Sequence, residues 1–228
     1  MFDGVTASLI DACRTENRKA AQTAHEKFEE AAKRAGLSAT SRVIEAGSAS
    51  ASDMFGRLAR SYDLSVVAQA QSGDEIAEDL IIEAALFSSG RPVLVVPYIQ
   101  KTGLKLDRVM VCWDGSRNAA RAIADAMPLL KKAKAIDVVT VESRERRNEI
   151  AGIEIAEHLA RHGLKIELKP IVATDTDVAN TILSYAADAS TDLIVMGGYG
   201  HSRLREFILG GATRGILGAM TVPTLMAH

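Results

Sequence analysis

The residues with the clearest chemical pattern form a glycine-rich stretch near the carboxyl end of the chain. Residues 196–203 read Met-Gly-Gly-Tyr-Gly-His-Ser-Arg, and a second glycine pair, Gly210 and Gly211, begins ten residues after Gly200. Because glycine has no Cβ, its backbone N–H groups can approach a ligand closely. The second pair precedes a helix-like segment, whose free N–H groups and positive dipole end favour phosphate. The stretch therefore predicts an anion cradle that suits a polyphosphate.

Other phosphate-binding and hydrolase motifs do not fit this stretch. Gly210 and Gly215 have the spacing of a Walker A loop, but the Lys-Ser/Thr pair that must follow is absent. Gly198 and Gly200 begin a dinucleotide-binding pattern in which Arg203 replaces the third glycine. The sequence also lacks a Gly-x-Ser-x-Gly nucleophile elbow. With no evident general base, the pattern favours a binding protein over a catalyst.

Composition and charge narrow the class of protein. A chain of 228 residues with 47% hydrophobic and 25% charged residues has a globular balance. A net charge of −2 predicts neither a nucleic-acid nor a membrane partner. Short apolar runs and the lack of a signal-peptide pattern lead us to expect a cytoplasmic protein. His158 and His162 lack a third ligand, so we expect no metal site.

The elements that must position the glycines alternate between apolar strand-like runs and amphipathic helical runs. This alternation predicts an α/β fold with a doubly wound, open parallel sheet. Ser116 is a plausible helix N-cap, and Gly163 marks a helix end. Strands are expected at residues 109–113, 138–141, 166–172, 193–196 and 222–226, and helices at 117–130, 148–162, from Asp175 or Thr176 to 187, and from the glycine region to 220.

The first half of the chain repeats the later part of this pattern. Residues 32–37, 62–67 and 90–96 parallel residues 159–164, 191–196 and 221–226, at offsets of 127, 129 and 131. We therefore expect two tandem copies, in domains 1–100 and 101–228, with a junction near 97–105. The first copy is shortened, because nothing before Asn17 resembles the strand, turn and helix of residues 109–130. We expect its first helices at residues 5–15 and 17–35.

The turn of the first copy has lost the glycine pattern. Residues 68–75 take the place of the glycine-rich turn, and four acids accompany them, which are Asp74, Glu75, Glu78 and Asp79. Carboxylates repel a phosphate group. We therefore expect one anion site per chain, in the second copy.

These features together resemble a known family. Residues 106–228 resemble a universal stress protein domain, and residues 17–97 resemble a degenerate copy of it. The motif that carries the resemblance is Gly197-x2-Gly200-x9-Gly210, after a strand pattern that begins with a strand and Asp114-Gly115-Ser116. The resemblance is to the ATP-binding branch of the family. It implies an adenine nucleotide alpha hydrolase-like fold and a role in the stress response.

The resemblance also implies a ligand set for ATP, with or without Mg²⁺. Asp114 would lie by the adenosine, the backbone of Val141 would meet the adenine edge, and Gly197 would lie by the ribose. The residues expected at the phosphates are Gly200, His201, Gly210, Gly211, Ala212 and Thr213. The family usually has Ser or Thr where this chain has Gly211, and losing one hydrogen bond to a charged group costs about 1.5–3 kcal/mol.

Several alternatives stay open. Asp114 fits a turn or helix-cap role as well as a ligand role. The chain also fits a nucleotide-free interaction module of the same fold, or a slow ATP hydrolase that uses Asp114 and Mg²⁺. Family resemblance implies that the closing strands 92–96 and 223–227 pair across a two-fold axis. The expected assembly is thus an intramolecular pseudo-dimer or a homodimer.

Overall fold

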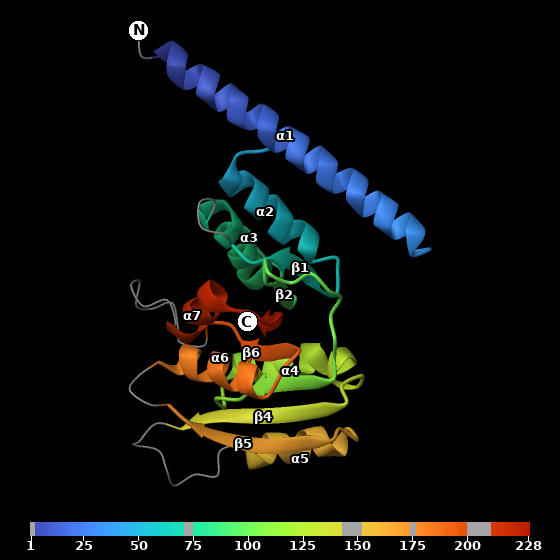
Figure 1. Cartoon of the computed structure of the whole chain (residues 1–228), viewed down its shortest axis with the longest axis vertical. Helices are drawn as coiled ribbons and strands as arrows, with labels where there is room; N and C mark the ends of the chain where they lie inside the picture. Colours follow the sequence, from blue (N-terminus) through green and yellow to red (C-terminus); the bar gives the residue numbers. More distant parts are fainter. Residues whose placement is uncertain (1–2, 71–74, 143–151, 174–176, 200–210) are drawn as a thin grey trace. The chain divides into compact units, whose positions relative to one another are not determined.

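The chain divides into two compact units, Met1–Ala51 and Ser52–His228. This computed structural model describes residues 3–70, 75–142, 152–173, 177–199 and 211–228 (Figure 1). We call the units unit 1 and unit 2 and treat each by itself. The predicted repeat junction near residue 100 falls within unit 2.

One long helix makes up most of unit 1. Helix α1 spans Asp3–Arg34, where the sequence predicted separate helices at 5–15 and 17–35. The prediction of a break was wrong because no glycine or proline interrupts residues 5–35. The helix ends at Arg34, and Gly36 shortly after it has a left-handed φ of 65°, while Leu37 N–H donates to the carbonyl of Ala32 at 3.0 Å. This is the glycine-dependent helix end that the repeat predicted.

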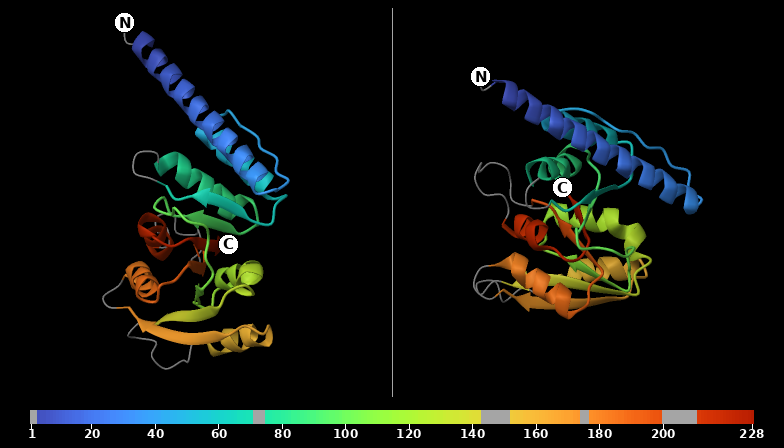
Figure 2. Two further views of the ribbon diagram at one scale, coloured as in Figure 1. Left: turned by 45° about the vertical axis from the view of Figure 1, so that its right-hand side comes forward. Right: turned by 45° about the horizontal axis from the view of Figure 1, so that its top comes forward.

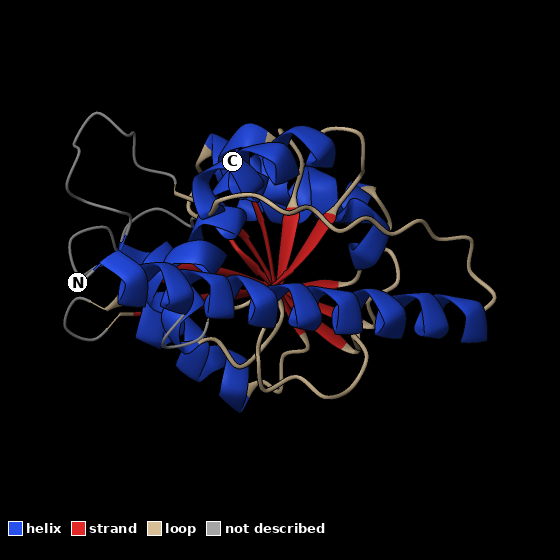
Figure 3. Ribbon diagram, turned by 90° about the horizontal axis from the view of Figure 1, so that it is seen from above, coloured by secondary structure: helices blue, strands red, loops and turns tan. Residues whose placement is uncertain are grey.

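Unit 2 is built on one seven-stranded sheet. Its strand order is β1-β2-β7-β6-β3-β4-β5. Figure 3 shows the strands in red with helices around them. Every neighbouring pair is parallel except β2 and β7, which are antiparallel with Leu94 opposite Leu225. The strands are β1 (Ser65–Ala68), β2 (Val93–Val96), β3 (Arg108–Cys112), β4 (Ala135–Glu142), β5 (Ile166–Val172), β6 (Leu193–Gly197) and β7 (Thr224–Ala227).

The antiparallel pair corrects the expectation of a purely parallel sheet. A single mixed, mostly parallel sheet runs across the predicted junction at 97–105, because β2 lies before the junction and β7 after it. Pairing between the closing strands 92–96 and 223–227 was expected from the family resemblance, and the register of β2 with β7 confirms it. The apolar edges of both strands are thereby covered.

Helices cover both faces of the sheet (Figure 2). On one face, α3 (Glu75–Ser88), α6 (Val178–Asp188) and α7 (Gly211–Ala219) pack on a core that includes Met110 and Ile194. On the other face, α4 (Arg117–Leu130) and α5 (Ile153–Arg161) pack on a core that includes Val111 and Val195. Helix α2 (Ser48–Ala59) lies across the boundary between the units in sequence. No helix in the described ranges is both long and apolar enough to cross a membrane.

The observed bounds agree closely with the strongest sequence signals. Helix α4 and strand β5 span the predicted residues, and Ser116 is the N-cap of α4. Helix α6 is capped by Asp177, whose Oδ1 accepts from Ala179 N at 3.0 Å, whereas Asp175 and Thr176 lie outside the described residues. Strand β7 begins at Thr224 rather than at residue 222, because Pro223 has no N–H for a ladder.

Candidate functional site

The candidate site lies where strand order reverses in the sheet. Strands β3 and β6 are parallel neighbours, with Val109 opposite Leu193 and Val111 opposite Val195. The chain leaves β3 toward β4 on one side, while β6 and β7 lie on the other. In open α/β sheets, ligands bind outside the carboxyl ends of the strands at such a switch point. Asp114 follows β3 directly, and Gly197 ends β6.

Asp114 builds the turn between β3 and α4. Its side chain is exposed, and its Oδ1 accepts a hydrogen bond from Ser116 N at 2.9 Å. Ser116 Oγ in turn accepts from Ala119 N at 3.1 Å, and Gly115 between them has a left-handed φ of 76°. The turn role of Asp114 is confirmed by these contacts. Its second carboxylate oxygen accepts no hydrogen bond from the described residues, so the ligand role stays a prediction.

Gly197 allows β6 to touch the first turn of α4. A Cβ at this position would lie 2.6 Å from Ala119 N and 2.8 Å from the carbonyl carbon of Asn118. Both neighbours are backbone atoms of a helix, which cannot yield easily. The glycine is therefore needed for close packing of α4 on β6, in addition to any contact with a ribose.

Asn118 connects the two sides of the switch point. Its side chain is 3% exposed, and its Nδ2 donates to the carbonyl oxygen of Gly198 at 2.7 Å. The Nδ1 atom of His228 lies 2.9 Å from Asn118 Nδ2 and 3.1 Å from the same carbonyl oxygen. Depending on its tautomer, His228 accepts from Asn118 or donates to Gly198. These contacts hold the turn after β6 against the start of α4.

A second contact joins the two described ends of the glycine-rich stretch. The backbone N–H of Tyr199 donates to Thr213 Oγ1 at 3.2 Å, and Thr213 is 4% exposed. Tyr199 has a φ of 49°, a left-handed conformation that non-glycine residues rarely adopt. The structure thus brings Thr213 to the end of β6, where its hydroxyl holds the turn. Gly200, His201 and Gly210 lie outside the described residues.

Gly211 and Ala212 are the first two described residues of α7, in the segment where the sequence predicted a helix to begin. Gly211 is exposed, and a Cβ placed on it would meet no atom of the described residues within 4 Å. A serine side chain therefore has room at this position, and nothing in the described packing requires glycine.

Val141 presents backbone groups beyond the end of β3. The ladder between β3 and β4 ends with Cys112 opposite Val139, and Trp113 N donates to the carbonyl of Val139 at 2.8 Å. Residues two apart in a strand direct their N–H and C=O groups to the same side. The polar groups of Val141 thus lie on the β3 side, past the point where β3 stops. The adenine edge was predicted to meet these groups.

Aromatic residues border the turn after β6. Phe87 of α3 lies 5.0 Å from the ring of Tyr199 and 4.8 Å, edge to face, from the ring of His228, measured between ring centroids. Burial, followed by the nearby charges of Glu83 and Asp79, raises the pKa of Tyr199, while Arg214 opposes the shift. The first half of the chain thus contributes both an aromatic contact and negative charge beside this turn.

Sequence reasoning did not identify three of these residues, Asn118, Phe87 and His228. Asn118 carried a usable signal, because it is a polar residue in line with the buried stripe of α4 that includes Ala122 and Ala126. A polar side chain at a buried helix position requires a hydrogen-bond partner. Phe87 and His228 carried no comparable signal, since their roles depend on the packing of distant segments.

The thiol next to the site is poorly suited to chemistry. Cys112 ends β3 and packs partly buried against the core. Burial, with a smaller effect from Asp114, raises the pKa of its thiol to about 12. Because the thiolate is the nucleophile and the metal ligand, the protonated thiol is unreactive near neutral pH.

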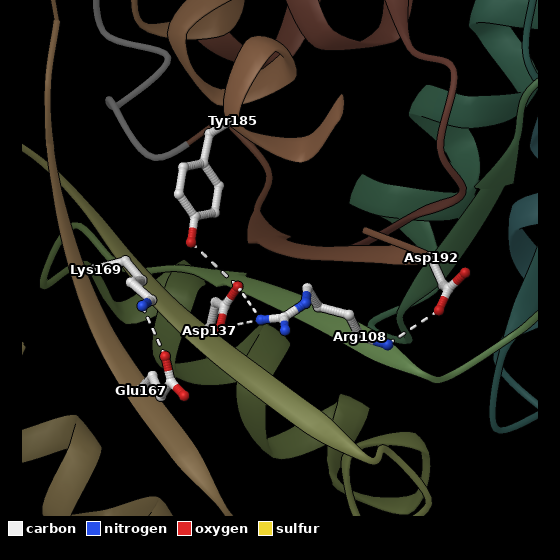
Figure 4. Close-up of polar contacts among 6 residues, drawn as sticks. All are labelled: Arg108, Asp137, Glu167, Lys169, Tyr185 and Asp192. Carbon is white, nitrogen blue, oxygen red and sulfur yellow. Dashed lines mark hydrogen bonds and ion pairs between the residues drawn. The ribbon is translucent and has the colours of Figure 1, made fainter. Parts of the chain in front are cut away.

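A separate polar cluster stabilises the amino ends of the strands (Figure 4). Arg108 donates from Nη1 to both carboxylate oxygens of Asp137 at 2.9 Å, and Asp137 is 1% exposed. The hydroxyl of Tyr185 also donates to Asp137, at 3.1 Å. Asp192 accepts from the backbone N–H of Arg108 at 3.0 Å. The cluster lies at the end of the sheet opposite the switch-point turns and joins β3, β4 and α6.

Comparison with known proteins identifies the family. The family model described as the universal stress protein family matches residues 105–228, which is more than half of the chain. The chain belongs to the universal stress protein family. A curated relative, universal stress protein Slr1230 of Synechocystis sp., is 29% identical over 147 residues, which is 63% of this chain and 49% of the relative. The match therefore spans about half the length of that universal stress protein.

Solved structures share the fold over most of the chain. A universal stress protein from Archaeoglobus fulgidus has a TM-score of 0.67 and 20% identity, and the match covers 96% of this chain and 78% of the other. A putative universal stress protein from Pseudomonas aeruginosa has a TM-score of 0.59 and 12% identity, with 90% and 77% covered. At these identities the likeness concerns the universal stress protein fold alone.

Proposed function

We propose that this universal stress protein binds ATP in a single site within residues 101–228, in a regulatory rather than catalytic role. The observation that carries the proposal is that the two described ends of the glycine-rich stretch both lie at the switch point. Tyr199 N–H bonds to Thr213 at 3.2 Å, and Gly198 C=O bonds to Asn118 at 2.7 Å. The proposed ligand loop thus starts and ends beside the carboxyl ends of β3 and β6.

The polar groups around the switch point suit a nucleotide better than a simple anion. Val141 offers an N–H and a C=O beyond the end of β3, which matches the donor and acceptor pattern of an adenine edge. The first turn of α7, from Gly211, offers N–H groups to phosphates. Asp114 keeps one carboxylate oxygen free of described partners for the adenosine. Backbone donors dominate, so side-chain changes in the loop alter affinity without abolishing it.

We further propose that residues 1–100 form a degenerate copy without a nucleotide site of its own. The parallel pair β1 and β2 meets the parallel pair β6 and β7 through an antiparallel contact, as expected for an intramolecular pseudo-dimer. In the first copy, Asp79 and Glu83 place negative charge near Tyr199. These acids disfavour bare phosphate, and Mg²⁺ bound to the nucleotide would lessen the repulsion.

A nucleotide-free interaction module is the second candidate. Two observations favour it: Gly211 supplies no hydroxyl, and the hydroxyl of Thr213 already accepts a hydrogen bond from Tyr199. Under this alternative the hydrogen bonds of Gly198, Tyr199 and Thr213 serve the fold alone.

Trp113 provides an intrinsic reporter that separates the two candidates. It is the only tryptophan and directly precedes Asp114. Under our proposal, titration with Mg-ATP changes its fluorescence in a saturable way. Asp114→Ala weakens binding, and Asp125→Ala, which removes a carboxylate paired with Arg121 on α4, leaves it unchanged. If neither the fluorescence nor the amount of ATP that the protein retains changes in a saturable way at millimolar nucleotide, the interaction module is favoured. Phosphate release that is lost in Asp114→Ala would instead indicate a hydrolase.

A further inference from the structure

Helix α3, which belongs to the first half of the chain, lies directly against the turn that follows β6. Gly198 in this turn is buried, and a Cβ placed on it would lie 2.7 Å from Cδ2 of Leu86. Leu86 is itself only 2% exposed, so its side chain has little room to move away. The backbone of the turn therefore fits closely against α3.

Phe87, the next residue of α3, contacts the second residue of the turn. Its ring centroid lies 5.0 Å from that of Tyr199, at an interplanar angle of 49°, and 4.8 Å from that of His228. Tyr199 has a left-handed φ of 49°, and a residue other than glycine keeps such a conformation only where its surroundings hold it. Phe87 holds the side chain of Tyr199, and Thr213 holds its backbone N–H.

Gln69 forms a second link between the first half of the chain and the glycine-rich segment. At the repeat offset of 129 residues it takes the position of Gly198, and it is 2% exposed. Its Nε2 donates to the carbonyl oxygen of Leu217 at 2.9 Å, and its Oε1 accepts from Tyr98 N at 3.3 Å. Carbonyls in the last turn of a helix have no partner within the helix, and α7 ends at Ala219. Gln69 therefore holds the carboxyl end of α7.

We propose that Phe87 and Gln69 are positioning residues for the nucleotide site. They hold the two described ends of the proposed phosphate-binding segment, residues 198–199 and α7, in the arrangement that binds phosphates. The first half of the chain lacks the glycine pattern and supplies no ligand group, yet it shapes the site of the second half. This inference rests on the proposed ATP site.

A positioning role differs from a purely structural one in which ligand it affects. Phe87 and Gln69 contact the turn after β6 and helix α7, where we propose that the phosphates bind. Asp114 and Val141, which are proposed to meet the adenosine, belong instead to the turn after β3 and to β4. Loss of either link should therefore weaken the binding of Mg-ATP more than the binding of adenosine. A general loss of stability would affect both ligands alike.

The test measures the affinity of the full chain for Mg-ATP and for adenosine, from the fluorescence of Trp113. Phe87→Ala and Gln69→Leu should each weaken Mg-ATP binding about three- to tenfold and leave adenosine binding unchanged. Phe87→Leu, which removes the ring but keeps an apolar side chain, should show the same pattern if Phe87→Ala does not fold. Phe55→Ala is the matched control, because Phe55 of α2 is a half-buried phenylalanine that packs against the same core. It should leave the ratio of the two affinities unchanged.

A second measurement needs no nucleotide. Amide hydrogen exchange followed by NMR reports how firmly the turn is held. In Phe87→Ala the N–H of Tyr199 should exchange faster than in the wild type, relative to the N–H of Trp113, which donates to the carbonyl of Val139 at 2.8 Å. Phe55→Ala should leave this relative rate unchanged.

The outcomes separate this inference from the proposed function. If the wild type binds Mg-ATP, and the affinity ratio in Phe87→Ala or in Gln69→Leu equals that of the wild type, the positioning role is overturned and the ATP site stands. An unchanged relative exchange rate of Tyr199 in Phe87→Ala overturns the positioning role as well. If the wild type binds neither Mg-ATP nor adenosine, the proposed function is overturned, and this inference with it.

Discussion

The side-chain amide of Asn118 donates a 2.7 Å hydrogen bond to the carbonyl oxygen of Gly198, across a sequence separation of 80 residues. One residue lies in the first turn of α4 after β3, and the other follows β6 directly. Because these strands flank the switch point, the contact fixes the two walls of the candidate site relative to each other. It therefore connects the stability of the fold with the shape of the site.

Removing this amide should destabilise the protein and weaken the site together. Asn118 is 3% exposed, so Asn118→Ala leaves a buried carbonyl with one partner fewer. The expected loss in the free energy of unfolding is about 1–3 kcal/mol. Urea denaturation measures the loss. Asn180→Ala, which removes a solvent-exposed hydrogen bond from the side-chain amide to the Asp177 carboxylate, is the matched control and should stay within about 0.5 kcal/mol of wild type.

Two glycine-to-alanine changes should have opposite effects on stability. In Gly197→Ala the new Cβ would lie 2.6 Å from Ala119 N, so the helix and the strand must separate. Overpacking of this kind costs about 1–3 kcal/mol. Gly218 lies within α7, and a Cβ added there would meet no described atom within 4 Å, so Gly218→Ala should gain about 0.5–1 kcal/mol. Thermal unfolding measures both, and equal shifts would show that close packing at Gly197 is unimportant.

Removing one partner of the ion pair at the amino ends of the strands should cost more free energy of unfolding than removing the other. The side chain of Asp137 is 1% exposed and that of Arg108 is 37% exposed. Arg108→Met leaves a buried carboxylate without its cation, which costs about 3–5 kcal/mol. Asp137→Asn leaves a guanidinium that can reach water and keeps an acceptor for Tyr185, so we expect a smaller loss. Denaturation of both variants at pH 7 tests the order, and a larger loss for Asp137→Asn would refute it.

Tyr185 should make the stability fall at alkaline pH. Burial, with the adjacent Asp137 charge next in importance, raises the pKa of its phenol from 10.0 to about 12. The unfolded chain releases this proton above about pH 10, whereas the folded chain keeps it until about pH 12. The stabilisation is therefore complete below pH 10 and is lost as pH rises toward 12. Tyr185→Phe should show a shallower fall over this range in urea titrations, and identical slopes would contradict the assignment.

Much of unit 2 followed from local sequence signals. The bounds of α4 were predictable because Ser116 is a good cap and the apolar residues recur at helical spacing. The nearness of the ends of β3 and β6 was implied by the family resemblance alone, which places Asp114 and Gly197 at one ligand. The antiparallel β2–β7 contact was expected from the resemblance alone, since no local pattern specifies which strand edges meet.

The parts that escaped prediction depend on contacts between distant segments. The hydrogen bond from the N–H of Tyr199 to the hydroxyl of Thr213 was not foreseen, and the role of Thr213 as a phosphate ligand stays a prediction. Phe87 contacts Tyr199 and His228 only because α3 packs beside the turn after β6. Periodicity and capping residues describe single helices and strands, so they cannot predict contacts between distant segments.

Calorimetric titration with Mg-ATP tests the central claim most directly. We expect one site per chain in the wild type. Gly211→Ser supplies a hydroxyl where a Cβ meets no described atom within 4 Å. It should tighten binding about ten- to hundredfold, the equivalent of about 1.5–3 kcal/mol, while Gly211→Ala should not. Absence of binding at millimolar nucleotide in the wild type and in Gly211→Ser would contradict the proposed nucleotide site.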